Sequence, residues 1–350
     1  MNVARLRPSY ESESEAYSRA GCSAWHSNLA PRGGGRPIHG TDVNDNPLLI
    51  LPTPVRARLT DDPIELLKFA AEAFKDSQVA IATLVEIRGG AARSLGSQVI
   101  VLSDGRFAGY VSGGCVEAAV AAEALLAMAQ GRDRTVRFGD GSPFLDVVLP
   151  CGGGITVAIH VMRRMEEVER ALESLRLRQA TALRYSPAKQ TLDLVEPVER
   201  AGWLGDDFLI IYRPSTKIVI SGQTIEVRSV ARLAECSGFE VTVLAPERGL
   251  RLIEEVVDPF SAVLLLHHDL EQELPVLEAA LRTSCFYLGA LGSRRTHQLR
   301  LNRLLRLGHD QPELERIKAP IGLFGPARDS ASLALSILAD VAASRSGAFG

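Results

Sequence analysis

The sequence predicts an α/β protein with an N-terminal mixed α/β domain and a C-terminal Rossmann-like domain built on a doubly wound parallel sheet. Two observations carry this prediction. Residues 217–247 alternate strand, tight turn, helix, glycine and strand, which is the βαβ pattern of a parallel sheet. Before them, short apolar runs bounded by turn residues lie among amphipathic helical patterns, and this mixture is typical of a mixed α/β domain.

The composition narrows the class of protein. A length of 350 residues allows about two domains, and 46% hydrophobic with 23% charged residues is ordinary for a globular chain. A formal net charge of -3 without a strongly basic run gives no reason to expect nucleic acid. Apolar runs stop short of the ~20 residues of a membrane span, and the first residues lack signal-peptide order. Five cysteines without regular spacing argue for a reducing compartment, so we expect a cytoplasmic protein.

We divide the sequence into three parts: a flexible tail over residues 1–46, a first domain over 47–213 and a second domain over 214–350. The tail is polar, rich in Gly, Pro and Ser, and has no apolar period of 2 or 3.6 residues. Its cysteine and two histidines have no metal-site spacing, so we interpret the tail as unstructured.

The first domain is predicted to mix helices and strands. Asp62 and Pro63 form an N-cap and first helical turn, and the apolar residues after them share one helical face. The Asp-Gly pair at 104–105 predicts a hairpin. The expected helices are 64–74, 115–131 and 163–177, and the expected strands are 79–86, 98–102, 106–111, 134–138, 146–149, 155–161, 181–185, 191–195 and 208–212.

Two cysteines lie in glycine clusters, Cys115 in SGGCVE and Cys151 in LPCGGGI. Gly113 and Gly114 let the backbone turn sharply after a strand, and Cys115 then opens an Ala/Leu-rich helical pattern. Free N–H groups and the dipole at a helix start favour an anion and lower a thiol pKa, so we expect an activated thiol. The alternative is a small apolar residue packed at a strand-to-helix corner. Because two such cysteine turns follow strands, we favour a binding role.

The loop of residues 89–97 is a weaker candidate. Its Arg93, Ser94 and Gly96 can cradle an anion, but an ordinary solvated loop explains them as well and is the interpretation we favour.

The second domain gives a strong fold signal and a weak nucleotide signal. The expected strands are 217–220, 262–266 and 285–288, and the expected helices include 274–282 and 330–343. Of the Gly-x-Gly-x-x-Gly fingerprint of dinucleotide sites only Gly222 is present, since Thr224 stands where the second glycine is expected. Ala245 and Pro246 stand where an acid normally binds the ribose. We therefore do not expect bound NAD.

Polar residues follow two other strands of this domain. His268 and Asp269 end one strand, where a hydrogen bond within the fold is an equally good explanation. A Gly/Ser turn with two arginines ends another strand and opens a helix, whose N-terminus suits a phosphate or other anion. A solvated helix face is the alternative for these arginines. We call this segment the arginine turn, and its candidate residues are Gly289, Ser293, Arg294 and Arg295.

These motifs together resemble a known family. SGGCVE, the downstream CGGGI, HHD, YLGALGSRRTH and ERIKAPIGL are similar to segments of the xanthine dehydrogenase accessory proteins, the XdhC/CoxI-like family, over about residues 60–345. The resemblance implies a chaperone that binds the molybdenum cofactor in its molybdopterin form and protects it from oxidation. It also implies sulfuration of the cofactor with a cysteine desulfurase and delivery to a molybdenum hydroxylase such as xanthine dehydrogenase.

Carried over by position, the resemblance matches Cys115 and Cys151 to the family's two glycine-flanked cysteines, and the arginine turn to its C-terminal motif. We therefore hypothesise that Cys115 contacts the molybdenum end of the cofactor, as a soft thiolate suits that metal. The arginine turn would then hold the phosphate of the pterin. This is a binding and transfer role more than the turnover of a small substrate.

The sequence departs from the family at the nucleotide-type turn, where GQTIE at 222–226 replaces the common G-A-G-H-V. Two other functions stay open. One is an NAD(P)-dependent oxidoreductase, suggested by the Rossmann pattern alone, and the other is a scaffold that only docks the desulfurase and the hydroxylase. Whether the chain forms a homodimer is also open.

Overall fold

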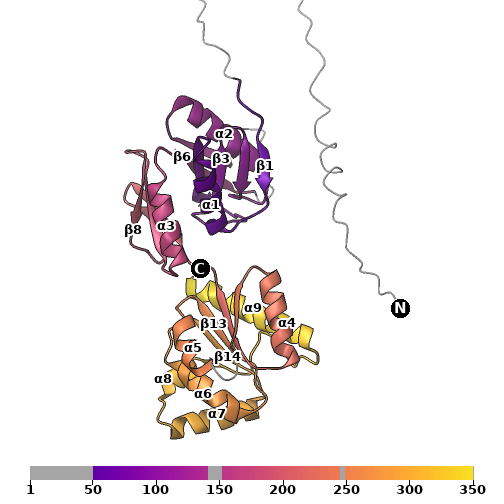
Figure 1. The fold of residues 1–350 in the computed structure, drawn as a ribbon. Coiled ribbons are helices and arrows are strands. Elements are labelled where there is room, and N and C mark those ends of the chain that lie inside the picture. The colour runs from indigo at the N-terminus through magenta and orange to yellow at the C-terminus, as the bar shows by residue number, and fades with distance from the viewer. Residues whose placement is uncertain (1–49, 141–151, 245–248, 350) are drawn as a thin grey trace, which may run out of the picture. The chain divides into compact units, whose positions relative to one another are not determined.

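The computed structural model describes residues 50–140, 152–244 and 249–349 (Figure 1). The predicted tail, the predicted strand at 146–149 and Cys151 lie outside the described residues. No helix within the described ranges is long and apolar enough to cross a membrane.

The first part of the fold is a six-stranded mixed sheet. One face is covered by helix α2 (Glu117–Gln130), and the other by α1 (Pro63–Ala73) and α3 (Glu166–Arg176). All neighbouring strands are antiparallel except the first pair, which is parallel. In spatial order the strands are β1 (Val55–Arg58), β4 (Arg106–Gly109), β3 (Gln98–Leu102), β2 (Val79–Arg88), β6 (Gly154–Val161) and β5 (Arg134–Gly139).

Local chemistry explains the elements that lead to the site. The Asp62 carboxylate accepts hydrogen bonds from the backbone N–H groups of Ile64 and Glu65 at 2.7 and 3.1 Å, so the predicted N-cap of α1 is confirmed. Gly109 ends β4 at a φ of +101°, and a Cβ there would lie 2.2 Å from the backbone oxygen of Gln98. Only glycine fits this position, from which the chain enters the cysteine loop.

A separate four-stranded antiparallel sheet packs its apolar face against α1 and α3. Its strands in spatial order are β8 (Thr191–Val195), β7 (Thr181–Ser186), β10 (Asp207–Tyr212) and β9 (Gly202–Leu204). The Tyr212 hydroxyl donates to Gln98 Oε1 at 2.8 Å and joins this sheet to β3. The predicted strands are confirmed, and β9 is an addition that the sequence pattern did not reveal.

The second part is an all-parallel five-stranded sheet with helices on both faces, as predicted. Helices α4 (Ile225–Cys236) and α9 (Ser330–Phe349) cover one face side by side, and α5 (Gly249–Val256), α6 (Leu270–Leu281) and α7 (Arg294–Arg306) cover the other (Figure 1). A short helix, α8 (Gln311–Glu315), precedes the last strand. The strands in spatial order are β12 (Glu240–Leu244), β11 (Lys217–Ser221), β13 (Ser261–Leu265), β14 (Tyr287–Ala290) and β15 (Ile317–Lys318).

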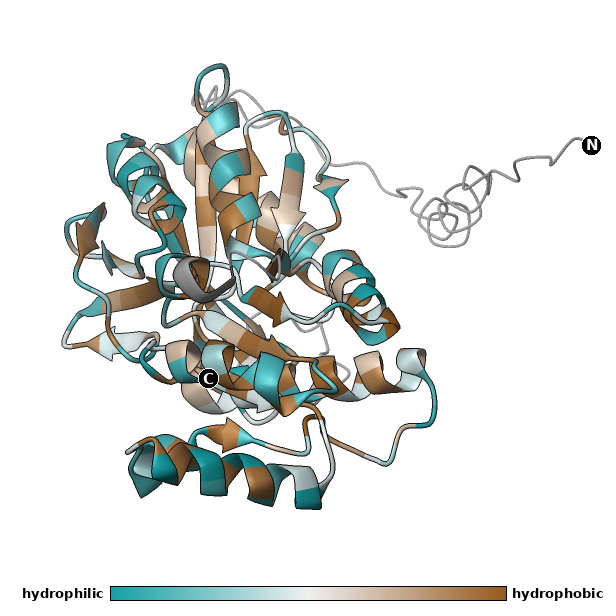
Figure 2. Cartoon of the chain, turned by 60° about the horizontal axis from the view of Figure 1, so that its bottom comes forward, coloured by the Kyte–Doolittle hydropathy of each residue, from teal (hydrophilic) through white to brown (hydrophobic). Residues whose placement is uncertain are grey.

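The strand order places the topological switch point between β11 and β13, because successive connections run to opposite sides of β11. Apolar residues concentrate on the strands, whereas the helices alternate polar and apolar residues (Figure 2). This is the pattern of a sheet buried on both faces.

The helices of the second part differ from the prediction in three respects. Helix α6 begins at Leu270 and not at 274, because the Asp269 side chain caps it by accepting from Glu271 N at 2.9 Å. Pro275 therefore lies inside this helix. Helix α9 runs on to Phe349, and α5 was not predicted.

Candidate functional site

The Cys115 loop lies between β4 and α2. The expectation that Cys115 opens the helix is wrong by two residues, since α2 begins at Glu117 with Val116 as its N-cap. The reason is that the backbone bends through residues 111–116, with Gly114 at a φ of +109°, before the first helical hydrogen bond from Val120 N to Val116 O. Cys115 itself is exposed and free, so its sulfur is available to a ligand.

A buried carboxylate organises this loop. Glu117 is fully buried, and its Oε1 accepts hydrogen bonds from Val111 N at 3.1 Å, Ser112 N at 2.8 Å and the Ser112 hydroxyl at 2.9 Å. The Ser112 Oγ lies 3.4 Å from Cys115 Sγ. Glu117 Oε2 is buried and has no hydrogen-bond partner among the described residues. The buried carboxylate of Glu117 therefore fixes the start of the loop that carries the thiol.

The sequence analysis missed Glu117. An acid at the first position of a helix, directly after a glycine-rich turn, is the signal that could have found it, because exposed loop N–H groups and the positive helix end both attract a carboxylate.

Arg93 also contacts the Cys115 loop. Its Nε donates to the Ser112 carbonyl at 3.4 Å, its guanidinium pairs with Asp61 at 2.5 Å, and it lies 5.1 Å from the centre of the Tyr110 ring. The segment 89–97, which we favoured as a solvated loop, thus contributes one side chain that supports the cysteine loop.

The strand ends at the switch point hold His267 and His268. Ser221 Oγ lies 2.9 Å from His267 Nε2, and burial lowers the pKa of His267, which favours a neutral ring. His268 is exposed, with its Nε2 3.8 Å from Glu226 Oε1. Asp269 serves as the N-cap of α6, which is the hydrogen bond within the fold that we gave as the alternative to ligand binding.

The turn after β11 carries an acid. Glu226 lies in the first turn of α4, and its Oε2, like Thr224 Oγ1, is buried without a hydrogen-bond partner in the described part of the chain. Doubly wound folds bind pyrophosphate at this helix start, and a carboxylate there repels it.

In the arginine turn, Gly289 and Ser293 have structural roles. A Cβ on Gly289 would lie 2.6 Å from both Ile321 and Tyr287 side chains, so this glycine makes room for packing. The Ser293 hydroxyl accepts from the backbone N–H of the third residue of α7 at 3.2 Å. Arg294 and Arg295 are exposed at the helix start and stay a predicted anion site.

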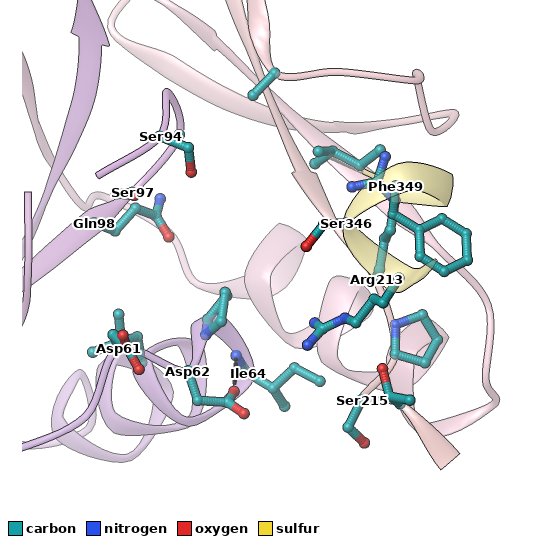
Figure 3. A pocket seen from close by; sticks show the side chains of 18 of the residues that line it. Asp61, Asp62, Ile64, Ser94, Ser97, Gln98, Arg213, Ser215, Ser346 and Phe349 are labelled. Atoms are coloured by element: carbon teal, nitrogen blue, oxygen red, sulfur yellow. Dashed lines mark hydrogen bonds between the residues drawn. The ribbon is translucent and has the colours of Figure 1, made fainter. Parts of the chain in front are cut away.

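A cavity among the described residues lies apart from these strand ends. It has a volume of about 680 Å³ (Figure 3). Its lining residues come mainly from the start of α1, the segment 93–98, the segment 213–216 and the end of α9. Thr216, Phe239 and Phe260 line it, and each directly precedes one of the parallel strands, β11, β12 and β13. The cavity therefore lies at the amino ends of these strands, whereas His268 and the arginine turn follow the carboxyl ends. Neither Cys115 nor the arginine turn is among its lining residues.

The fold and the exposed thiol define a two-part α/β protein with a glycine-cysteine loop beside a Rossmann-like domain. Family models match both parts: the XdhC and CoxI family over residues 75–139 and the XdhC Rossmann domain over residues 218–341. The chain is 48% identical over 295 residues to the molybdenum cofactor insertion chaperone PaoD of Escherichia coli (strain K12), spanning 83% of this chain and 92% of that protein. The chain belongs to the XdhC and CoxI family, as its motifs suggested.

Two further proteins are similar to this chain. The uncharacterized protein YqeB of the same organism is 26% identical over 75% of this chain and 42% of its own length. A crystal structure described as a xanthine dehydrogenase from Bacillus halodurans superposes with a TM-score of 0.64 at 20% identity, covering 82% of this chain and 96% of that one. At this identity the likeness shows the fold alone, and it confirms the predicted α/β architecture.

Proposed function

We propose that this protein is a molybdenum cofactor insertion chaperone that serves the maturation of a molybdenum hydroxylase. The observation that carries the proposal is the 48% identity, over 92% of its length, to a protein named for this function. The cofactor is the cargo of such a protein, bound and then passed on.

The Cys115 loop fits a metal-bearing cargo. The thiol is exposed, and a thiolate is a soft ligand of the kind that molybdenum accepts. The hydrogen bonds to Glu117 fix the backbone at Val111 and Ser112, so the glycine turn that presents the sulfur starts from a fixed point. Cys115 is the residue that contacts the molybdenum end of the cofactor in this proposal, and Cys151 is its proposed companion.

The remaining parts of the proposal concern form, partners and place. The cargo is the molybdopterin form of the cofactor, a cysteine desulfurase supplies the sulfur ligand, and xanthine dehydrogenase or a related hydroxylase receives the product in the cytoplasm. These steps rest on the family resemblance and on the relative's name.

A negative charge at the nucleotide-type turn argues against the alternative of an NAD(P)-dependent oxidoreductase. Nicotinamide dinucleotides place a pyrophosphate at the helix after the first strand, and here that helix start carries the carboxylate of Glu226. Only Gly222 of the three fingerprint glycines is present. Both features oppose a dinucleotide at that turn.

The test is to purify the full chain after coexpression with a cofactor supply and to measure molybdenum, pterin and nicotinamide per chain. The proposal predicts molybdenum and pterin in the wild type and their loss, by tenfold or more, in Cys115→Ala. Cys236→Ala is the matched control, because Cys236 is also exposed but lies in α4. A chain that carries nicotinamide and no molybdenum would sink the proposal, and a fully loaded Cys115→Ala variant would remove Cys115 from it.

A further inference from the structure

We propose that the 680 Å³ cavity is an anion-binding site that receives the phosphate-bearing end of the pterin cargo, held by Arg200, Arg213 and Arg345. This inference rests on the proposed function for the identity of the cargo. The site is distinct from the arginine turn, which the sequence suggested for the phosphate.

The lining of the cavity has an excess of positive charge. Four arginines line it, and the acids of the lining are Asp61 and Asp62. Both acids are already engaged, since Asp61 pairs with Arg93 at 2.5 Å and Asp62 caps α1. Arg200, Arg213 and Arg345 have no carboxylate within salt-bridge distance in the described residues. None of these three guanidinium groups is neutralised by a carboxylate of the described residues, and each keeps N–H donors for an anion.

Two of these arginines are close enough to repel one another. Burial and the positive charge of Arg345 lower the pKa of Arg213, although a guanidinium stays charged at neutral pH. Arg213 is fixed in place, because it donates to the Glu199 carbonyl at 2.5 Å and lies over the Phe349 ring at 5.6 Å. The half-buried Arg213 and the exposed Arg345 carry like charges close together, and an anion between them stabilises both.

The other walls suit a ring with polar edges. Phe260 and Phe349 lie with their ring centres 5.4 Å apart at the cavity, and they offer an aromatic surface. Ser94, Ser97 and Gln98 lie on one side of the space in Figure 3 and Arg213, Ser346 and Phe349 on the other. Hydroxyl groups beside aromatic rings and arginines match a phosphorylated heterocycle, and the volume lies in the usual range of ~300–1,000 Å³ for ligand sites.

A side chain that lines the cavity also contacts the Cys115 loop. Arg93 and Tyr110 line the cavity, and Arg93 donates to the carbonyl of Ser112, three residues before Cys115. A cargo whose phosphate lies among the arginines can thus extend along Tyr110 towards the exposed sulfur. The arginine turn follows the carboxyl end of β14 and has no such connection, because the cavity is lined at the amino ends of these strands.

The experiment compares two pairs of substitutions in the full chain. Arg200→Ala with Arg345→Ala removes two exposed cavity arginines that pair with no carboxylate of the described ranges, so we expect the fold to be preserved. Arg294→Ala with Arg295→Ala is the matched control of equal charge. Molybdenum and pterin per chain are measured after coexpression, and inorganic phosphate is titrated against the thermal unfolding midpoint of the chain without cargo.

The cavity pair is expected to lower cargo retention and phosphate affinity at least tenfold, since each charge-assisted bond contributes about that factor. The control pair is expected to behave like the wild type. The inference would be overturned if the cavity pair retained as much molybdenum and pterin as the wild type. It would also be overturned if only the control pair lost them. If the wild type itself carries no molybdenum, the proposed function fails, and the phosphate titration then decides the cavity separately.

Discussion

Replacing Glu117 by alanine tests the claim that this acid holds the cysteine loop. Glu117 Oε1 accepts three hydrogen bonds, and two of the donors are backbone N–H groups of Val111 and Ser112, which are 0% and 8% exposed. A buried donor left without an acceptor costs about 1–3 kcal/mol. Removal of Oε2, which is buried and has no hydrogen-bond partner in the part of the chain that the structure describes, offsets part of this cost. We expect Glu117→Ala to lower the free energy of unfolding by about 2–4 kcal/mol.

Glu117→Gln is the control, because its carbonyl oxygen can keep the three accepted hydrogen bonds. We expect it to lose less than half as much stability as the alanine variant. Urea unfolding gives the free energies, and native-state hydrogen exchange follows the amides of Val111 and Ser112 directly. These amides should exchange at least tenfold faster in Glu117→Ala. A variant with unchanged exchange at both amides and wild-type stability would refute the role assigned to the acid.

Two further predictions concern stability. Arg300 and Glu273 form a fully buried ion pair, so Arg300→Ala should cost about 3–5 kcal/mol in urea unfolding, whereas Arg303→Ala, in an exposed pair on the same helix, should change stability by less than about 1 kcal/mol. Similar losses in both variants would contradict this. Burial raises the pKa of Asp133, but its hydrogen bond and charge interaction with His160 and its other bonds outweigh burial and leave that pKa below its usual value. Its stabilisation is present above about pH 4 and is lost as the pH falls further, so Asp133→Asn should flatten the acid limb of the stability curve; an unchanged limb would argue against it.

The fold could be predicted where local chemistry decides the outcome. The Asp62 cap, the hairpin at 104–105 and the βαβ unit from 217 onward all formed as expected, because capping, turn and periodicity signals act over a few residues. Strand β1 was missed because its residues are mostly exposed and pair only at a sheet edge, so they show no apolar pattern.

The site could be predicted only in part. Cys115 was found from its glycine turn, but the helix start two residues later and the buried role of Glu117 depend on how the loop folds back. The arginines of the cavity come from positions 200, 213 and 345, which no periodicity connects, so only the tertiary fold brings them together. Conversely, Ser293 and Asp269 looked like ligand-binding residues and act as helix caps, because the same side chains suit both tasks.

The proposed insertion function is tested by transfer of molybdenum from the loaded chain to a cofactor-free molybdenum hydroxylase. After mixing and separation, molybdenum is counted on both proteins and the activity of the hydroxylase is followed. The account predicts that molybdenum leaves this chain and appears on the hydroxylase in equal amount, together with activity, and that Cys115→Ala transfers none. The insertion function would be contradicted if molybdenum stayed on this chain. It would also be contradicted if the hydroxylase became equally active in the absence of the loaded chain.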